Sequence, residues 1–277
     1  MPAKLKSINW QMIVAIALFS LLVIYWIFFQ IFLTADDANH RQIYTFSTIY
    51  GVTALYGAIC GLLIARKWGG IKSILGRGLL FLSIGLLAQE FGQLVYSYYY
   101  IVQNLETANY PSLGDVGFFG TIPLYCIGII YLAKASGVTL RIKSVVHIVP
   151  AIAITFAILA FGYYLFLQDY TFDWSAPIKT FLDFGYPLGA AIYISLAIGT
   201  YILSKGVLGG IMKSKILFLL LALCLQFLAD YMFLYQISRG TWVDSGVNEL
   251  IYLISYFVMT MALLQFGSIY NKLKDEK

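Results

Sequence analysis

The chain has 277 residues, of which 61% are apolar and only 11% are charged. A soluble domain carries about 25% charged residues, so this composition excludes the ordinary soluble classes and indicates a protein folded in a lipid bilayer. The net charge is +5. The way in which the basic residues are distributed along the chain is explained by membrane topology, so we expect no nucleic-acid partner.

In chain order, apolar runs long enough to cross a membrane, about 20 residues each, follow one another with short connectors. They predict an all-α integral membrane protein that forms one domain over residues 1–277. The first run is longer than the apolar region of a signal peptide and lacks a cleavage motif, so we expect it to be a retained helix. The eight predicted helices cover residues 9–34, 44–65, 78–103, 114–133, 145–168, 177–203, 215–237 and 247–268.

The lysines and arginines predict the orientation of these helices. Fifteen of the 18 fall on the side that holds both termini, and only Arg41, Lys179 and Arg239 fall on the other side. Because positive charge stays cytoplasmic, we expect a multi-pass protein of the plasma or inner membrane with cytoplasmic N- and C-termini. The basic Gly-Gly loops at 69–70 and 209–210 are candidates for contact with a cytoplasmic signalling partner or with anionic lipid headgroups.

A weak internal repeat runs through the chain. A shift of 68 residues brings Ser47 onto Asp115 and Asp115 onto Asp183, and a further shift of 66 brings Asp183 onto Glu249. An aromatic residue follows three positions after each of them. The pattern predicts a helical hairpin used four times, and hence two parallel four-helix halves over about residues 9–137 and 145–268.

The acids divide into two groups by depth. Asp115 and Glu249 lie at predicted helix starts, where a carboxylate caps free N–H groups and meets the positive end of the helix dipole. Glu90 and Asp230 lie deep in their helices, Glu90 at about 18 Å from the helix start at 1.5 Å per residue. An ionisable residue at such depth is costly and is by default a functional candidate, although a neutral packing role between helices is the alternative.

Acids, amides and tyrosines in the outer half predict a pocket under the outer face. Carboxylates combined with aromatic faces suit a small organic cation, and they could equally hold protons. The competing interpretation is that the tyrosines form an interfacial aromatic belt. The candidate ligand-binding residues are Glu90, Gln93, Asp115, Asp183, Tyr186, Tyr193, Gln226, Asp230, Glu249 and Tyr252.

Motifs of known catalytic chemistry are missing from the sequence. There is no metalloprotease, nucleophile-elbow or phosphate-loop motif, and His40 and His147 have no companions at ligand spacing. The cysteines, Cys60, Cys126 and Cys224, lie in separate predicted helices and show no paired spacing. We therefore expect no cofactor, no metal site and no enzymatic activity.

Two segments carry a resemblance to a known family. Residues 110–125, YPSLGDVGFFGTIPLY, and residues 181–193, FLDFGYPLGAAIY, are similar to segments of the eight-span membrane sensor regions of bacterial diguanylate cyclases and histidine kinases. The resemblance covers about residues 75–268 and implies a membrane receptor for a small or lipid-like signal, with Asp115 and Asp183 where that family keeps its acids. The chain departs from the family because no output domain follows the last helix, which implies that a partner supplies the output or that the chain has another role.

Three functions remain open at this level. A stand-alone sensor or ligand-binding module leads, because the predicted cytoplasmic half is apolar and offers no polar path. A small transporter or proton-coupled carrier that uses Glu90 and Asp230 is the alternative, supported by the repeat and by Pro123 and Pro187 within predicted helices. A structural subunit of a membrane complex is the third, and homo-oligomerisation is left open.

Overall fold

The computed structural model describes residues 10–32, 40–105, 110–137, 145–168, 170–204 and 210–275, and these residues contain helices and connecting turns but no strand. Eight helical segments are long and apolar enough to cross a membrane, which confirms the predicted number. They are Trp10–Phe32, Tyr44–Lys67, Ile74–Val102, Gly114–Ala135, Val149–Leu167, Pro177–Ser204, Ser214–Arg239 and Val247–Lys274.

The helices follow one another up and down the bundle. Their bounds are α1 (Trp10–Phe32), α2 (His40–Ile49), α3 (Val52–Lys67), α4 (Ile74–Ser97), α5 (Gly114–Ala135), α6 (Val145–Gly162), α7 (Pro177–Ser204), α8 (Gly210–Arg239) and α9 (Val247–Asp275). A π-helical turn, Tyr98–Val102, extends α4, and a second, Tyr163–Leu167, extends α6. α7 begins with Pro177, whose missing N–H and fixed φ suit the first turn of a helix.

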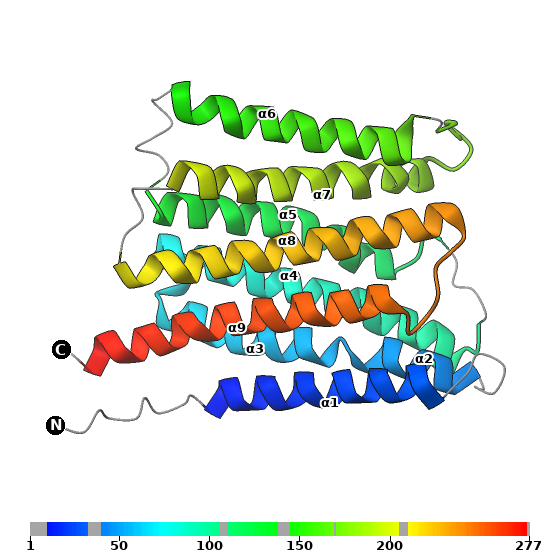
Figure 1. Cartoon of the computed structure of the whole chain (residues 1–277), viewed down its shortest axis with the longest axis horizontal. Coiled ribbons are helices and arrows are strands. Elements are labelled where there is room, and N and C mark those ends of the chain that lie inside the picture. The colour runs from blue at the N-terminus through cyan, green and yellow to red at the C-terminus, as the bar shows by residue number, and fades with distance from the viewer. Residues whose placement is uncertain are drawn as a thin grey trace.

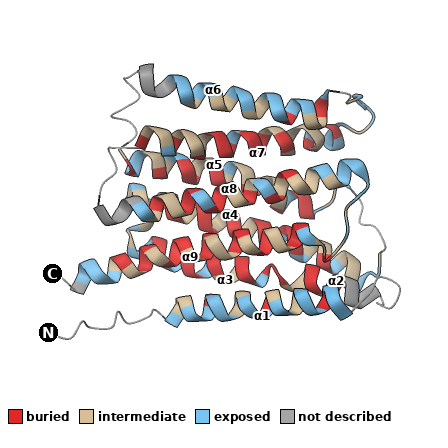
Figure 2. Ribbon diagram, in the orientation of Figure 1, coloured by how far each residue is buried: buried red, intermediate tan, exposed pale blue. Residues whose placement is uncertain are grey.

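Six helices form a closed ring, with packing between α3 and α4, α4 and α5, α5 and α7, α7 and α8, α8 and α9, and α9 and α3. α1 packs on the outside of this ring, mainly against α9, and α6 packs on the outside against α7 (Figure 1). Figure 2 shows that buried residues gather in the ring helices, whereas α1 and α6 are mostly exposed or half-buried. In a bilayer, the exposed apolar faces of α1 and α6 are compatible with contact to lipid.

The two ends of the bundle differ in charge. α1 begins and α9 ends at the same end (Figure 1), which we call the basic end. Described basic residues at helix ends and turns there are Arg66, Lys67, Lys72, Arg77, Lys134, Lys272 and Lys274. The opposite end, the acidic end, holds the first turns of α5 and α9 with Asp115 and Glu249. The segments of Lys4, Lys6, Arg141, Lys143, Lys205 and Lys277 lie outside the described residues.

The second predicted helix is interrupted within its candidate membrane span, where the sequence pattern predicted one continuous helix. α2 and α3 are separated by Tyr50 and Gly51. The side-chain amide of Gln93 in α4 donates to the carbonyl oxygen of Ser47, which is the acceptor that the Gly51 N–H would use in an unbroken α-helix. At the break, a side chain of a neighbouring helix therefore bonds to a backbone acceptor of the second span.

Glycines bring the backbones of α4 and α5 into contact. A Cβ atom at Gly117 of α5 would lie 2.4 Å from the carbonyl oxygen of Ala88 and 2.6 Å from the amide nitrogen of Gly92. One turn further along α5, the Thr121 hydroxyl donates a 3.2 Å hydrogen bond to the Gly85 carbonyl. Small residues permit such close approach between membrane helices, so α4 and α5 form a tightly packed pair.

The interior of the ring changes character along its length. In the half nearer the basic end it is filled by apolar side chains. Those with no measurable exposure include Leu79, Leu82, Ile129, Leu132, Leu219, Leu223, Leu263 and Phe266. In the half nearer the acidic end, polar and tyrosine side chains take their place, and the candidate site lies there.

Candidate functional site

A layer of buried polar and tyrosine side chains crosses the ring in the half nearer the acidic end. Hydrogen bonds and ring contacts connect most of its members, which come from α2 and the break that follows it and from α4, α5, α7, α8 and α9. We call this set the polar layer, and it consists of Ser47, Tyr50, Gln89, Glu90, Gln93, Tyr125, Tyr193, Gln226, Asp230, Glu249, Tyr252, Ser255 and Tyr256.

Asp230 of α8 is held by side chains of three helices. The Tyr193 hydroxyl of α7 donates a 2.7 Å hydrogen bond to its Oδ2. Its Oδ1 accepts from the Tyr252 hydroxyl of α9 at 3.0 Å and from the Gln226 amide, one turn away on α8, at 3.0 Å. Gln226 in turn accepts a 2.9 Å hydrogen bond from Ser255 of α9. The deep carboxylate therefore ties α7, α8 and α9 together, and three donors satisfy it.

Glu249, at the start of α9, joins the last membrane span to the second. Its Oε2 accepts a 2.8 Å hydrogen bond from the Ser47 hydroxyl and a 2.9 Å hydrogen bond from the backbone N–H of Ser245. Between the second span and α4, the Tyr50 hydroxyl donates a 3.0 Å hydrogen bond to Gln93 Oε1. These contacts close the ring between α9, the second span and α4.

Glu90 differs from the other acids of the layer. It is only 2% exposed, and its Oε2 has no hydrogen-bond partner among the described residues. That oxygen lies at the break between α2 and α3, where a Cβ atom on Gly51 would come within 2.0 Å of it. An unpaired charge in such a site is costly, because neither water nor a counter-charge offsets its loss of hydration.

Stacked tyrosines connect the two deep acids across the ring. The ring centroids of Tyr50 and Tyr256 lie 5.8 Å apart with nearly parallel planes, and those of Tyr256 and Tyr252 lie 6.0 Å apart. Because Tyr252 donates to Asp230 and Tyr50 donates to Gln93, one turn from Glu90, the tyrosines form a continuous row from α8 to α4.

Asp115 lies nearer the acidic end and caps α5. Its Oδ2 accepts from the backbone N–H of Ser112 at 2.7 Å, and the Ser112 hydroxyl accepts from the N–H of Gly114 at 3.1 Å. This is close to the reciprocal pattern of a capping box: the Ser112 hydroxyl meets the free N–H of Gly114, and Asp115 takes part in the cap by holding Ser112 in place. Its other oxygen accepts a 2.7 Å hydrogen bond from the Tyr186 hydroxyl of α7, so the cap also joins α5 to α7.

Asp183 lies in a separate cluster at the acidic end. Its carboxylate accepts from the Tyr110 and Tyr170 hydroxyls, both at 2.8 Å, and pairs with Lys179 at 3.3 Å. Burial, and next to it the hydrogen bond to Asp183, raise the pKa of the Tyr110 phenol above its ordinary value. In the preceding loop, hydrogen bonds from Ser175 lower the pKa of the exposed Asp173. The cluster attaches two loops to α7, and this structural role explains the position of Asp183.

The structure groups the ten predicted site residues into three places. The polar layer holds seven of them, and the remaining three lie nearer the acidic end, with Tyr186 on Asp115 and Asp183 in its own cluster. Sequence reasoning did not select Tyr125, Gln89, Ser255 or Tyr256 for the site, although Tyr256 lies one helical turn from Tyr252 on the same face. Their role in the layer depends on the ring arrangement, and only tertiary structure gives it.

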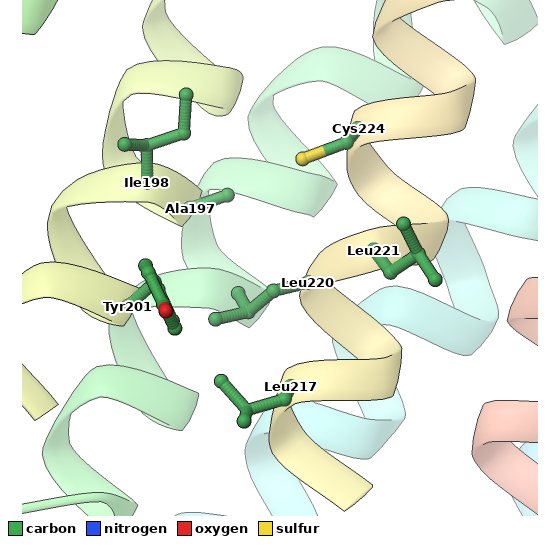
Figure 3. A pocket seen from close by; sticks show the side chains of 7 residues that line it. All are labelled: Ala197, Ile198, Tyr201, Leu217, Leu220, Leu221 and Cys224. Carbon is green, nitrogen blue, oxygen red and sulfur yellow. The ribbon is translucent and has the colours of Figure 1, made fainter. Parts of the chain in front are cut away.

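A cavity of about 290 Å³ lies outside the polar layer, in the half nearer the basic end. Figure 3 shows it in the gap between α7 and α8, with the side chains of both helices around it. Its lining is almost wholly apolar and consists of Ala197, Ile198, Tyr201, Leu217, Leu220, Leu221 and Cys224. It offers no carboxylate, and it is not the acidic pocket that the sequence predicted.

Comparison of the chain with protein-family models, with curated proteins and with solved structures gives no match in any of the three. The fold and the geometry therefore define the class of the protein as an all-helical protein with eight candidate membrane spans. Arguments about its function rest on the polar layer itself.

Proposed function

We propose that the chain is a membrane sensor module that responds to a small cationic ligand and uses the polar layer as its receptor region. The observation that supports this most directly is the unpartnered carboxylate oxygen of Glu90, buried at the α2–α3 break. Asp115, Asp183, Asp230 and Glu249 each accept two or more hydrogen bonds. Glu90 is the acid that still requires a positive partner.

The ligand must be small, because the side chains around Glu90 are closely packed. Gln93, Tyr50 and Tyr256 lie on neighbouring turns and helices, and Gly51 leaves no room even for a methyl group beside the carboxylate. The sequence-based expectation of an organic cation between aromatic faces is therefore narrowed to a proton or a compact monovalent cation.

The apolar half of the ring favours a sensor over a carrier. A transported cation would have to pass from the polar layer through the region of Leu82, Ile129 and Leu219, which are fully buried. Burial of a charge among apolar side chains is costly. A sensor that binds the cation at the polar layer without transporting it needs no such path. The output would then come from a cytoplasmic partner at the basic end, in keeping with the resemblance to bacterial sensor regions.

The test measures the melting temperature of the purified protein in nanodiscs against pH, Na⁺, ammonium and choline. A ligand that binds the folded state raises stability by RT ln(1 + [L]/Kd). We expect at least one small cation to raise the melting temperature of the wild type and of Asp115→Asn, and to leave Glu90→Gln unaffected. If Glu90→Gln responds like the wild type, or if nothing shifts the wild type, the proposal is wrong.

A proton-coupled carrier is the second candidate, and specific features favour it. The second span is broken beside Glu90, and Pro123 and Pro187 lie inside α5 and α7. Discontinuous helices beside a buried acid are typical of secondary transporters. Proteoliposomes with an entrapped pH dye separate the two functions: proton or cation flux that depends on Glu90 and Asp230 favours the carrier, and ligand binding without flux favours the sensor.

A further inference from the structure

We infer that Glu90 is a reversible proton-binding site and that its occupancy controls the backbone at the break between α2 and α3. This inference deepens the proposed function and rests on it, because it names the proton as the cation to which the receptor region responds. It is carried by the surroundings of one carboxylate and by the hydrogen bonding of one backbone amide.

The first observation concerns the backbone amide beside the carboxylate. Gly51 N–H does not bond to its helical acceptor, the Ser47 carbonyl, which accepts a hydrogen bond from Gln93. It donates none of the backbone hydrogen bonds found among the described turns and loops. The unpartnered Oε2 of Glu90 lies beside the same residue. An ionised carboxylate is a strong acceptor for a free N–H, whereas the O–H of a protonated carboxyl group is a donor.

The second observation concerns the charges around Glu90. The titratable side chains that lie within electrostatic range of it are tyrosines, Tyr50 from the second span and Tyr256 from α9. The next carboxylates are Glu249, within range of Tyr50, and Asp230, within range of Tyr256. α5 contributes another neutral phenol, Tyr125, to the layer. No lysine, arginine or histidine is a member of the described polar layer, so a proton is the charge-neutralising partner that fits the available space.

The two protonation states differ in what they do to the break. When Glu90 is ionised, the carboxylate attracts the Gly51 N–H and holds the chain in its broken form. When a proton from water at the acidic end forms an O–H bond on Oε2, this attraction is lost and the carboxyl group needs an acceptor instead. No electron transfer or co-reactant is involved, and deprotonation returns the same proton to water.

Infrared spectroscopy of the whole protein in nanodiscs tests the inference, because the C=O stretch of a protonated carboxyl group differs from that of a carboxylate. In the wild type we expect a carboxylic acid band that disappears as the pH rises. The component of this band that belongs to Glu90 should be absent from Glu90→Gln and displaced in Glu90→Asp, which retains a titrating group, whereas any component of Asp230 or Glu249 should remain in both variants. If Glu90→Gln does not fold, the displacement in Glu90→Asp still assigns the band.

A matched pair of glycine variants tests the link to the break. Gly51→Ala places a methyl group against Glu90 Oε2, and Gly57→Ala places one 2.1 Å from the Thr260 hydroxyl, on the same helix but away from titrating groups. Because the methyl group blocks the approach of the Gly51 N–H, we expect the titration midpoint of Gly51→Ala to move up by about one pH unit, a tenfold change in proton affinity. The midpoint of Gly57→Ala should stay that of the wild type.

Three outcomes would overturn the inference: carboxylic acid bands that are identical in Glu90→Gln and the wild type, a Glu90 component insensitive to pH, or equal midpoints in Gly51→Ala and the wild type. Loss of the band on addition of Na⁺ but not choline at constant pH would also overturn it, because the occupant would then be a metal cation. The proposed function fails separately. If the Glu90 band titrates but the maleimide reactivity of Ile71→Cys, an exposed position at the basic end, does not change with pH, the inference stands and the sensor is refuted, because no signal reaches the end where the output would arise.

Discussion

The hydroxyl of Ser47 in α2 donates a 2.8 Å hydrogen bond to the carboxylate of Glu249 in α9. These residues are 202 positions apart in the chain, and their contact closes the ring at the acidic end. We therefore expect the hydrogen bond from the Ser47 hydroxyl to Glu249 to stabilise the folded protein.

Ser47→Ala should lower the free energy of unfolding by about 1–3 kcal/mol, because it removes a donor from a buried carboxylate. Thr48→Ala is the matched control, since the Thr48 hydroxyl bonds only to the Tyr44 carbonyl of its own helix at 2.8 Å. Unfolding of the detergent-purified protein measures both. Equal losses in the two variants would show that the Ser47–Glu249 contact does not stabilise the ring.

The tyrosines that hold Asp230 should act as a unit with it. In a double-mutant cycle, Tyr193→Phe and Asp230→Asn should show a coupling energy of about 0.5–3 kcal/mol, the range for residues in direct contact. Tyr201→Phe, on the same helix but half-exposed at 45%, should couple to Asp230→Asn by close to zero. Additive effects of Tyr193→Phe and Asp230→Asn would contradict the hydrogen bond between them.

Two glycines three residues apart on α5 should respond oppositely to alanine. Gly117→Ala meets the backbone of α4 and should cost about 1–3 kcal/mol through overpacking. Gly120→Ala meets no atom within 4 Å and should be neutral, or stabilise α5 by up to about 1 kcal/mol through helix propensity. Comparing the thermal unfolding of the two variants measures the contrast. Equal stability would mean that α4 and α5 are not in backbone contact.

The predicted orientation can be tested by cysteine labelling in whole cells. Trp174, at the acidic end, is 80% exposed and Ile71, at the basic end, is 68% exposed. With a membrane-impermeant maleimide, Trp174→Cys should react in intact cells, and Ile71→Cys should react only after the membrane is opened. The wild-type chain, with its three buried or half-buried cysteines, gives the background. The reverse pattern would place the termini outside.

Local composition was enough to predict the eight spans, because burial in lipid imposes one apolar run for each crossing. The predicted starts at 114 and 177 coincide with those of α5 and α7. The break at Gly51 could not be predicted in this way, since the Gln93 side chain that bonds to the backbone there belongs to another helix. Helix periodicity predicts which side chains share a face of one helix. It does not predict a hydrogen bond from a side chain of another helix to a backbone carbonyl.

The site was predictable to a similar extent. Depth along the helices selected Glu90 and Asp230, of which Glu90 is buried and Asp230 is half-buried, because a residue's distance from a helix end follows from its number. The surroundings of the two acids differ. Asp230 accepts hydrogen bonds from three donors, whereas Oε2 of Glu90 has no donor among the described residues. This difference depends on which helices are neighbours in the ring. That order comes from tertiary packing between helices of similar apolar composition.

The cavity between α7 and α8 has a mechanical consequence for the ring. Near the acidic end these two helices are pinned together by the Tyr231 hydroxyl on the Pro187 carbonyl at 2.9 Å and by Tyr193 on Asp230. Nearer the basic end the cavity separates them, so few attractive contacts resist their movement. The backbone contacts between α4 and α5 make that pair stiff by comparison. We therefore expect the seam between α7 and α8 to be more compliant than that between α4 and α5, so that a small rotation about the polar layer would change the width of the seam at the basic end.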